Sequence, residues 1–257
     1  MPNPILTVYG KLYKHLPVQV RRGLRAIYHG AKIQDLECRE TVDAVEASYR
    51  RLGVVKEGCL VFDIGANIGI YADAFDRLGA RVVAVEPVPE CARIMREKFA
   101  KRQRVVVVEK GVGDAEGELE MFVAGNFVAS TFSQDFKKQE ENSFKTDYTH
   151  SVKAKITTLD CLIAEHGMPD YCKIDVEGFE PKALAGLSRK IGCLSFETHQ
   201  DGMEAARLCL EKLQALGYSR FACDSHQGEE FTLDDWGTSE KALEKAKSLQ
   251  FGNIFAK

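Results

Sequence analysis

From residue 58 onward, short apolar runs rich in β-branched residues alternate with segments of helical periodicity. The predicted strands are residues 60–64, 81–86, 105–108, 171–175 and 193–197, with an extra strand at 118–123. The predicted helices are residues 69–78, 90–101, 181–187 and 204–216. This alternation is typical of a mostly parallel, doubly wound sheet with helices on both faces, because parallel strands need long crossover connections. We therefore expect an α/β fold in which 105–108 is a fully buried strand.

The regular pattern breaks in one long stretch and resumes after it. Residues 124–155 are polar and irregular, and an excursion of this length often forms a lid or a binding loop. A short helix that Asp160 caps is expected to end near Gly167. Residues 218–223 and 253–256 can close the sheet, with a hairpin as one arrangement.

The N-terminal part differs from the rest of the chain in pattern and in charge. We expect residues 1–57 to form a helical extension, with 38–52 as its clearest helix, and residues 58–257 to form the main domain. Residues 1–34 carry six basic side chains and no acidic one, so the remainder has a net charge of −9. The basic segment is either a solvated helix or a contact for an anionic substrate, membrane surface or partner. The acidic remainder opposes a function in nucleic-acid binding.

Composition excludes several classes of protein. The 257 residues are 45% hydrophobic and 28% charged, which is typical of a globular chain that needs no disulfides. The eight cysteines include no pair at CxxC spacing, which argues against a zinc site and favours a reducing compartment. Because the chain has no run of about 18 apolar residues and no start like a signal peptide, we expect a cytoplasmic protein without a transmembrane segment.

The most informative local pattern is a predicted strand that ends in an acid and continues through a glycine turn into a helix. Its D-x-G-x-N-x-G sequence contains Asp63, Gly65, Asn67 and Gly69. A diphosphate prefers bare backbone N–H groups, whereas an amino-acid ammonium needs an acceptor such as Asp63. The third glycine of G-x-G-x-x-G is also missing, which disfavours a dinucleotide. The pattern predicts S-adenosylmethionine as the cofactor and resembles the first motif of class I S-adenosylmethionine-dependent methyltransferases.

Glu86 ends the second predicted strand, where an acid can accept hydrogen bonds from both ribose hydroxyls. Because dehydrogenases use an acid in the same way, Glu86 supports an adenosine cofactor only together with Asp63. One alternative is a tight turn at Gly65 and Gly69, with Asp63 capping the helix. A nicotinamide-dependent oxidoreductase is another, although no Tyr-x-x-x-Lys pair occurs at a helical position. A cofactor-binding protein without catalytic activity is a third.

A second group of polar residues follows two later strands. Asp175 and Glu177 lie in Lys-Ile-Asp-Val-Glu-Gly, and Glu197 and His199 end the next strand. The carboxyl ends of neighbouring parallel strands share one edge, so these side chains can face the crevice that contains Asp63. Methyl transfer needs alignment, exclusion of water and removal of the acceptor proton, and a carboxylate or an imidazole can accept that proton. We interpret all four as candidate catalytic residues.

The same four residues have two other interpretations. Asp175 or Glu177 can instead cap the helix that follows, as acids at helix starts do. A cation bound by Asp175, Glu177, Glu197 and His199 is a minority alternative, because hard cations prefer carboxylates. Nothing in the spacing indicates a ligand geometry, and we predict no metal.

Several segments together resemble the FkbM-type methyltransferase family over residues 58–257. They are residues 61–71, 84–87, 111–117, 130–131, 158–160, 173–178 and 195–197, and Lys-Ile-Asp-Val-Glu-Gly is the most specific of them. The resemblance implies a Rossmann-like, seven-stranded sheet and O-methylation of secondary metabolites, sugars or glycans, and it does not name the acceptor.

The resemblance also implies which residues form the site. The cofactor-binding residues that it implies are Asp63, Gly65, Asn67, Gly69 and Glu86, and Ser130, Thr131, Asp175 and Glu177 would border the acceptor pocket. Beside these we expect Ala66, Tyr71, Pro87, Gly113 and Asp114 to bind the cofactor and Lys173 to bind the substrate.

Overall fold

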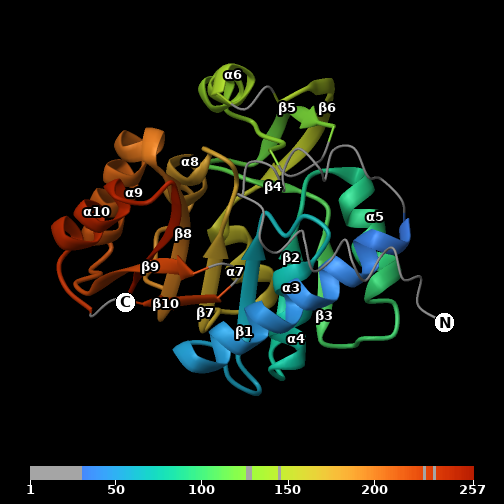
Figure 1. Ribbon diagram of the computed structural model, residues 1–257, viewed down its shortest axis with the longest axis horizontal. Coiled ribbons are helices and arrows are strands. Elements are labelled where there is room, and N and C mark those ends of the chain that lie inside the picture. Colours follow the sequence, from blue (N-terminus) through green and yellow to red (C-terminus); the bar gives the residue numbers. More distant parts are fainter. Residues whose placement is uncertain (1–30, 126–128, 144–145, 228–229, 234–235) are drawn as a thin grey trace.

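The computed structural model describes residues 31–125, 129–143, 146–227, 230–233 and 236–257 (Figure 1). Residues 1–30, which include most of the basic segment predicted to contact an anionic partner, lie outside these ranges. Within them, no helix combines the length and the apolar character needed to cross a membrane.

The main sheet has the strand order β10-β9-β11-β8-β7-β1-β2-β3. The strands are β1 Leu60–Ile64, β2 Arg81–Val85, β3 Val105–Val108, β7 Tyr171–Ile174, β8 Cys193–His199, β9 Phe221–Gln227, β10 Glu230–Leu233 and β11 Phe251–Ala256. Neighbouring strands from β3 to β8 are parallel, and β11 runs antiparallel to both β8 and β9. The predicted seven-stranded, mostly parallel Rossmann-like sheet is confirmed, and β10 extends it by pairing with β9.

Helices cover both faces of this sheet (Figure 1). One face carries α3 Ala31–Leu52, α4 Ile70–Arg77 and α5 Pro89–Lys98. The other carries α7 Leu159–His166, α8 Glu180–Ala185, α9 Met203–Ala215 and α10 Ser239–Lys247, and the short η1 Gln200–Gly202 precedes α9. Since side chains alternate along a strand, Phe62 and Ile64 enter the core beneath α7 to α9, and Val61 packs toward α3 and α4. The same alternation directs Asp63 toward the face of α3 and α4.

A smaller sheet lies beyond the carboxyl ends of the parallel strands (Figure 1). It contains β4 Gly111–Val112, β5 Gly117–Ala124 and β6 Tyr148–Thr157, and α6 Gln134–Ser143 lies between β5 and β6 in the chain. We call β5, α6, β6 and the described residues that connect them the cap unit. The prediction that residues 124–155 are irregular is wrong. Both elements escaped prediction because α6 buries only Phe136 and Glu140, and most β6 side chains are exposed or half-buried.

Three further expectations need correction. The strand β3 is not fully buried, because it forms an edge of the sheet and Val106 is 46% exposed. The cap of α7 is Thr158, whose side chain accepts from the Cys161 amide, whereas Asp160 accepts from the Ser188 amide. The strands β9 and β11 do pair, but they do not form a hairpin. The hairpin partner of β9 is β10, and the unpredicted α10 lies between β10 and β11 in the chain.

The helix α3 contains the predicted helix 38–52 and packs directly on the core of the main sheet. The buried Tyr49 hydroxyl lies 3.0 Å from the Tyr171 hydroxyl, which in turn lies 2.6 Å from Oγ of Ser195. The division of the chain at residue 57 stays a prediction, and the described part of the extension shares its apolar contacts with β1 and β7.

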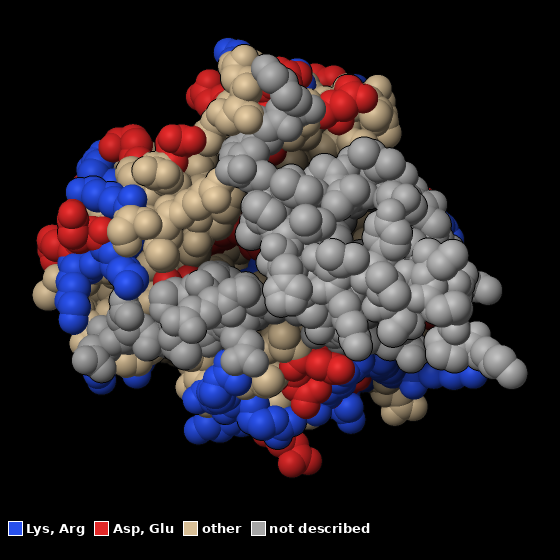
Figure 2. Space-filling model, in the orientation of Figure 1, with Lys and Arg blue, Asp and Glu red and all other residues tan. Residues whose placement is uncertain are grey.

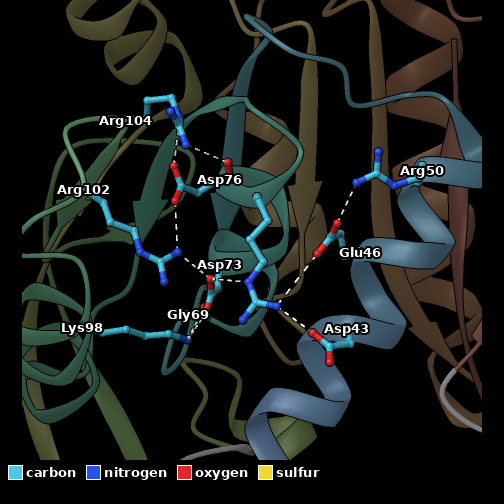
Figure 3. A network of polar contacts seen from close by, with 10 residues as sticks. Asp43, Glu46, Arg50, Gly69, Asp73, Asp76, Lys98, Arg102 and Arg104 are labelled. Carbon is cyan, nitrogen blue, oxygen red and sulfur yellow. Dashed lines mark hydrogen bonds and ion pairs between the residues drawn. The ribbon is translucent and has the colours of Figure 1, made fainter.

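Charged residues join α3 to α4 and α5 on the same face (Figure 3). The buried Asp73 and Asp76 of α4 form ion pairs with Arg77, Lys98, Arg102 and Arg104. Arg77 also contacts Asp43 of α3 at 2.7 Å. Burial opposes ionisation of Asp73, but the hydrogen bond from Arg102 and the nearby positive charges lower its pKa. The network therefore joins residues 73–77 of α4 to α3, to the end of α5 and to the segment that leads into β3.

Candidate active site

The loop between β1 and α4 follows a path that its glycines make possible. Gly65, Asn67 and Gly69 all have left-handed backbone angles, with φ of 81°, 50° and 76°. A Cβ atom on Gly65 would lie 1.7 Å from the carbonyl oxygen of Asp175, so only glycine lets the loop pass the end of β7. The amides of Gly65 and Ala66 both donate to the carbonyl of Val85. Lys98 supports the far end of the loop by donating to the Gly69 carbonyl at 3.0 Å.

Asp63 is completely buried, and neither of its carboxylate oxygens has a hydrogen-bond partner in the described part of the chain. Burial raises its pKa from 3.8 to about 6, the charge of Lys173 opposes this shift, and the charge of Asp175 adds to it. The N-cap of α4 is Gly69 rather than Asp63, but the Ala72 amide in the first turn of α4 lowers the pKa of Asp63, so an interaction of Asp63 with the helix start stays an alternative. Buried acceptors without partners are costly, and they fit a ligand that brings hydrogen-bond donors or a positive charge.

Glu86 joins the ends of β1 and β2. Its Oε2 accepts from the Asn67 amide and its Oε1 accepts from the Val88 amide, each at 2.8 Å. Burial raises the pKa of Glu86 to about 7, and the two backbone hydrogen bonds oppose that shift. Each oxygen keeps acceptor capacity for a further donor such as a hydroxyl group. Pro87 follows directly and is half-buried.

Lys173 of β7 is the register partner of Asp63 on the neighbouring strand β1, so both side chains lie on the same face of the sheet. Its ammonium is buried, donates to Oδ2 of Asp175 at 2.7 Å, and lies 4.1 Å from the centre of the Tyr71 ring. Burial alone would lower its pKa, but the charges of Asp175 and Asp63 together with the nearby Tyr71 and Tyr49 outweigh burial and raise the pKa, so Lys173 is charged. The structure thus brings together a predicted substrate residue, a predicted cofactor residue and a predicted catalytic residue.

Asp175, Glu177 and Glu197 form a carboxylate cluster in which one oxygen of each lies within 4.8 Å of the others. Burial, followed by the negative charges of Asp175 and Glu177, raises the pKa of Glu197 well above its ordinary range. The N-cap of α8 is Phe179, so neither Asp175 nor Glu177 occupies that position, and a favourable charge interaction of these acids with the helix start stays an alternative. The cluster can accept a proton or bind several hydroxyl groups.

His199 ends β8 but lies outside the carboxylate cluster, which corrects the four-residue cation alternative. Its ring is 5.5 Å from the Phe136 ring of α6, and its Nδ1 is 3.4 Å from Nε2 of Gln139. Burial lowers the pKa of His199, although the charge of Asp201 opposes the shift. His199 therefore contacts the cap unit, and its role as a base stays a prediction.

Ser130 and Thr131 are both buried in the cap unit. The Thr131 hydroxyl donates to the Glu177 carbonyl at 2.7 Å, and Oγ of Ser130 accepts from the Ala124 amide at 3.1 Å. Thr131 thus attaches the cap unit to the loop that carries Asp175 and Glu177. The prediction that these residues border the acceptor is compatible with this location.

Gly113 and Asp114 make different contacts from those expected of cofactor ligands. The Gly113 amide donates to Thr157 of β6, and the exposed Asp114 forms an ion pair with Lys182 of α8 at 2.8 Å. Gly113 therefore contacts the smaller sheet, and Asp114 contacts α8. Their assignment to the cofactor stays a prediction.

Sequence reasoning missed Glu180, which is buried in the first turn of α8. Its Oε1 accepts from the amides of Val176 and Gly178, at 3.0 and 3.3 Å. The only signal in the sequence is an acid three positions after Glu177, and that signal does not distinguish a solvent-exposed acid from one that binds the preceding loop.

Comparison with known proteins identifies the family of the domain. A family model described as "Methyltransferase FkbM domain" matches residues 63–219. No curated protein matches the chain.

Similar solved structures include three methyltransferases. A precorrin-6y C5,15-methyltransferase from Geobacter metallireducens has a TM-score of 0.43 and 14% identity, over 85% of this chain and 87% of that chain. A SAM-dependent O-methyltransferase from Thermotoga maritima has a TM-score of 0.43 and 15% identity, over 82% and 63%. A ribosomal protein L11 methylase from Lactobacillus delbrueckii has a TM-score of 0.44 and 12% identity, over 85% and 78%.

Proposed function

The chain belongs to the FkbM methyltransferase family, and on that premise we propose that it transfers a methyl group from S-adenosylmethionine to a hydroxyl group of a small molecule, sugar or glycan. The observation that carries this proposal is the completely buried, unpartnered carboxylate of Asp63 beside a glycine loop. Family membership opposes the oxidoreductase and the non-catalytic alternatives. A cytoplasmic location stays a prediction.

The residues around the loop fit the proposed cofactor. Asp63 offers two acceptor oxygens and a negative charge to an amino-acid ammonium, and Glu86 offers acceptors to ribose hydroxyls. Gly65, Asn67 and Gly69 keep the backbone close to the strand ends. When bound, S-adenosylmethionine supplies a methyl group activated by an adjacent sulfonium.

The carboxylate cluster suits a hydroxyl-bearing acceptor. Lys173 holds Oδ2 of Asp175, so Oδ1 of Asp175 is the atom that we expect to accept the proton of the acceptor hydroxyl. Glu177 and Glu197, whose pKa is raised by burial, then bind neighbouring hydroxyl groups. The acidic cluster would repel a phosphorylated acceptor, and acidic side chains also lie over the cap unit (Figure 2).

We propose that the cap unit covers the acceptor and excludes water from it. Thr131 binds the Glu177 carbonyl, and Phe136 packs on Gly178, where an added Cβ would lie 2.8 Å from the Phe136 side chain. These contacts place the cap unit directly on the loop that carries the expected base. Excluding water strengthens the electrostatic interactions inside such a site.

Calorimetry with S-adenosylhomocysteine tests the cofactor assignment. We expect wild type to bind, Asp63→Ala to bind at least tenfold more weakly, and the exposed-site control Glu116→Gln to match wild type. Equal binding by Asp63→Ala, or no binding by wild type, contradicts the assignment.

Methyl transfer is tested separately, by incubation with labelled S-adenosylmethionine and a panel of glycans and small polyols. Asp175→Asn is expected to keep its affinity for S-adenosylhomocysteine and to lose about 100-fold in turnover, which is the usual contribution of a general base. Unchanged turnover of Asp175→Asn on the acceptor that wild type methylates excludes Asp175 as the base.

A further inference from the structure

The loop between β7 and α8 has an unfavourable backbone shape. Glu177 and Gly178 are consecutive residues with positive φ, 53° and 84°. Glycine adopts this conformation freely, but for Glu177 it costs on the order of 1 kcal/mol or more, so surrounding groups must stabilise it. The same residue belongs to the carboxylate cluster, which means that the position of the cluster depends on this loop.

Close packing restrains one end of the loop, because an added Cβ on Gly178 would lie 2.8 Å from the Phe136 side chain. A small pocket near the start of α8 is bordered by Glu180, Glu197, Thr198 and His199. The hydroxyl of Thr198 is buried there without a hydrogen-bond partner among the described residues. The positive φ of Glu177 needs groups that fix the backbone on either side of this residue, and directional hydrogen bonds can do so.

Glu180 supplies two of those bonds from a single atom. Its Oε1 accepts from Val176 and from Gly178, the residues on either side of Glu177. The Thr131 hydroxyl binds the carbonyl of Glu177 from the cap unit. Hydrogen bonds thus fix the backbone immediately before Glu177, immediately after it and at its own carbonyl group.

We propose that Glu180 is a positioning residue that holds Asp175 and Glu177 in place for methyl transfer, without contacting the acceptor itself. This inference rests on the proposed function, because it assigns Glu180 a role through the carboxylate cluster. A misplacement of about 1 Å in a reacting group can cost about 100-fold in rate, so the loss of these two bonds would reduce turnover.

The role requires an acceptor oxygen rather than a full negative charge. Burial and the charge of Asp175 raise the pKa of Glu180, and the backbone hydrogen bonds oppose this, with a resulting value of about 7. Glutamine keeps an oxygen acceptor in a side chain of the same shape. Methionine fills a similar buried volume without one, so the pair Glu180→Gln and Glu180→Met separates hydrogen bonding from packing.

Hydrogen exchange at the amides of Val176 and Gly178 tests the structural part of the inference. We expect Glu180→Met to lose protection at both amides by more than tenfold and Glu180→Gln to keep it. A control, Asp170→Ala, removes a carboxylate that accepts from the Leu60 amide at 2.8 Å, at the opposite end of β1, and should leave both amides protected. Unchanged protection in Glu180→Met overturns the proposal.

Kinetics on the acceptor that wild type methylates test the functional part. For Glu180→Met we expect kcat to fall 10-fold to 100-fold, with the Kd for S-adenosylhomocysteine within about twofold of wild type, and for Glu180→Gln we expect turnover within about threefold. Wild-type turnover in Glu180→Met, or an equal loss in both variants, overturns the positioning role. Failure of the proposed function is distinguishable, because it shows in wild type as no methyl transfer and overturns both.

Discussion

Replacing Asp63 with asparagine is expected to stabilise the ligand-free protein at neutral and alkaline pH. The carboxylate is completely buried without a hydrogen-bond partner, and its pKa is raised from 3.8 to about 6. Because each tenfold change in proton affinity is worth about 1.4 kcal/mol, ionised Asp63 costs the fold about 3 kcal/mol. Asp63→Asn keeps the shape of the side chain and removes that charge.

The sign of the pH dependence follows from the raised pKa. Between about pH 4 and pH 6 the folded protein keeps the proton on Asp63 while the unfolded chain releases it, so stability from this group is present below about pH 4 and lost as the pH rises through about 6. Asparagine does not titrate. The advantage of Asp63→Asn should therefore be near zero at pH 4 and about 3 kcal/mol at pH 8.

Urea unfolding followed by the fluorescence of Trp236, the only tryptophan, measures this difference. Glu116→Gln, which removes an exposed charge, controls for the change in net charge. S-adenosylhomocysteine at 100 times its wild-type Kd should add about 2.7 kcal/mol to wild type and less to Asp63→Asn. The reasoning is refuted if Asp63→Asn is no more stable than wild type at pH 8 without ligand, or if its advantage is the same at both pH values.

Three other substitutions test individual contacts. Gly65→Ala would place a Cβ 1.7 Å from the Asp175 carbonyl oxygen at a residue whose φ is 81°. We therefore expect the free energy of unfolding to fall by more than about 2 kcal/mol and calorimetry to detect no binding of S-adenosylhomocysteine. Normal binding would contradict this expectation. Lys173→Met leaves Asp175 without its buried cation, and urea unfolding should show a loss of about 3 kcal/mol at pH 7; a variant as stable as wild type would contradict this. Tyr49→Phe removes the hydroxyl that contacts Tyr171, and should lower stability by about 1 kcal/mol within a single unfolding transition; a separate early transition would mean that α3 unfolds independently of the sheet.

Local patterns predicted the central part of the fold well. The β1 strand and the adjoining turn are encoded by a continuous apolar run, an acid and glycines that are adjacent in the chain, so short-range physics decides them. Prediction failed where burial is not periodic. The helix α6 has two buried residues in ten, so its sequence lacks the periodic apolar pattern of a helix. Val106 belongs to an apolar run that forms the edge strand β3, so the apolar composition wrongly predicted a fully buried strand.

The candidate site shows the same division. Asp175 and Glu197 were recognised because each ends a parallel strand, and strand ends converge at one edge. Their distance, the pairing of Asp175 with Lys173 and the contact of His199 with the cap unit depend on register and on packing between distant segments. Glu180 was missed for this reason, because its side chain turns back onto the loop instead of toward solvent.

The order of strands and helices, the glycine turn and the acids at the strand ends are properties of neighbouring residues, and the sequence by itself determined them. Only the tertiary structure decided which acids lie together, which are buried without partners and which residues hold the loop. The physical reason is that proton affinity and hydrogen bonding depend on the solvent exclusion and the charges around a group, and those come from segments far apart in the chain.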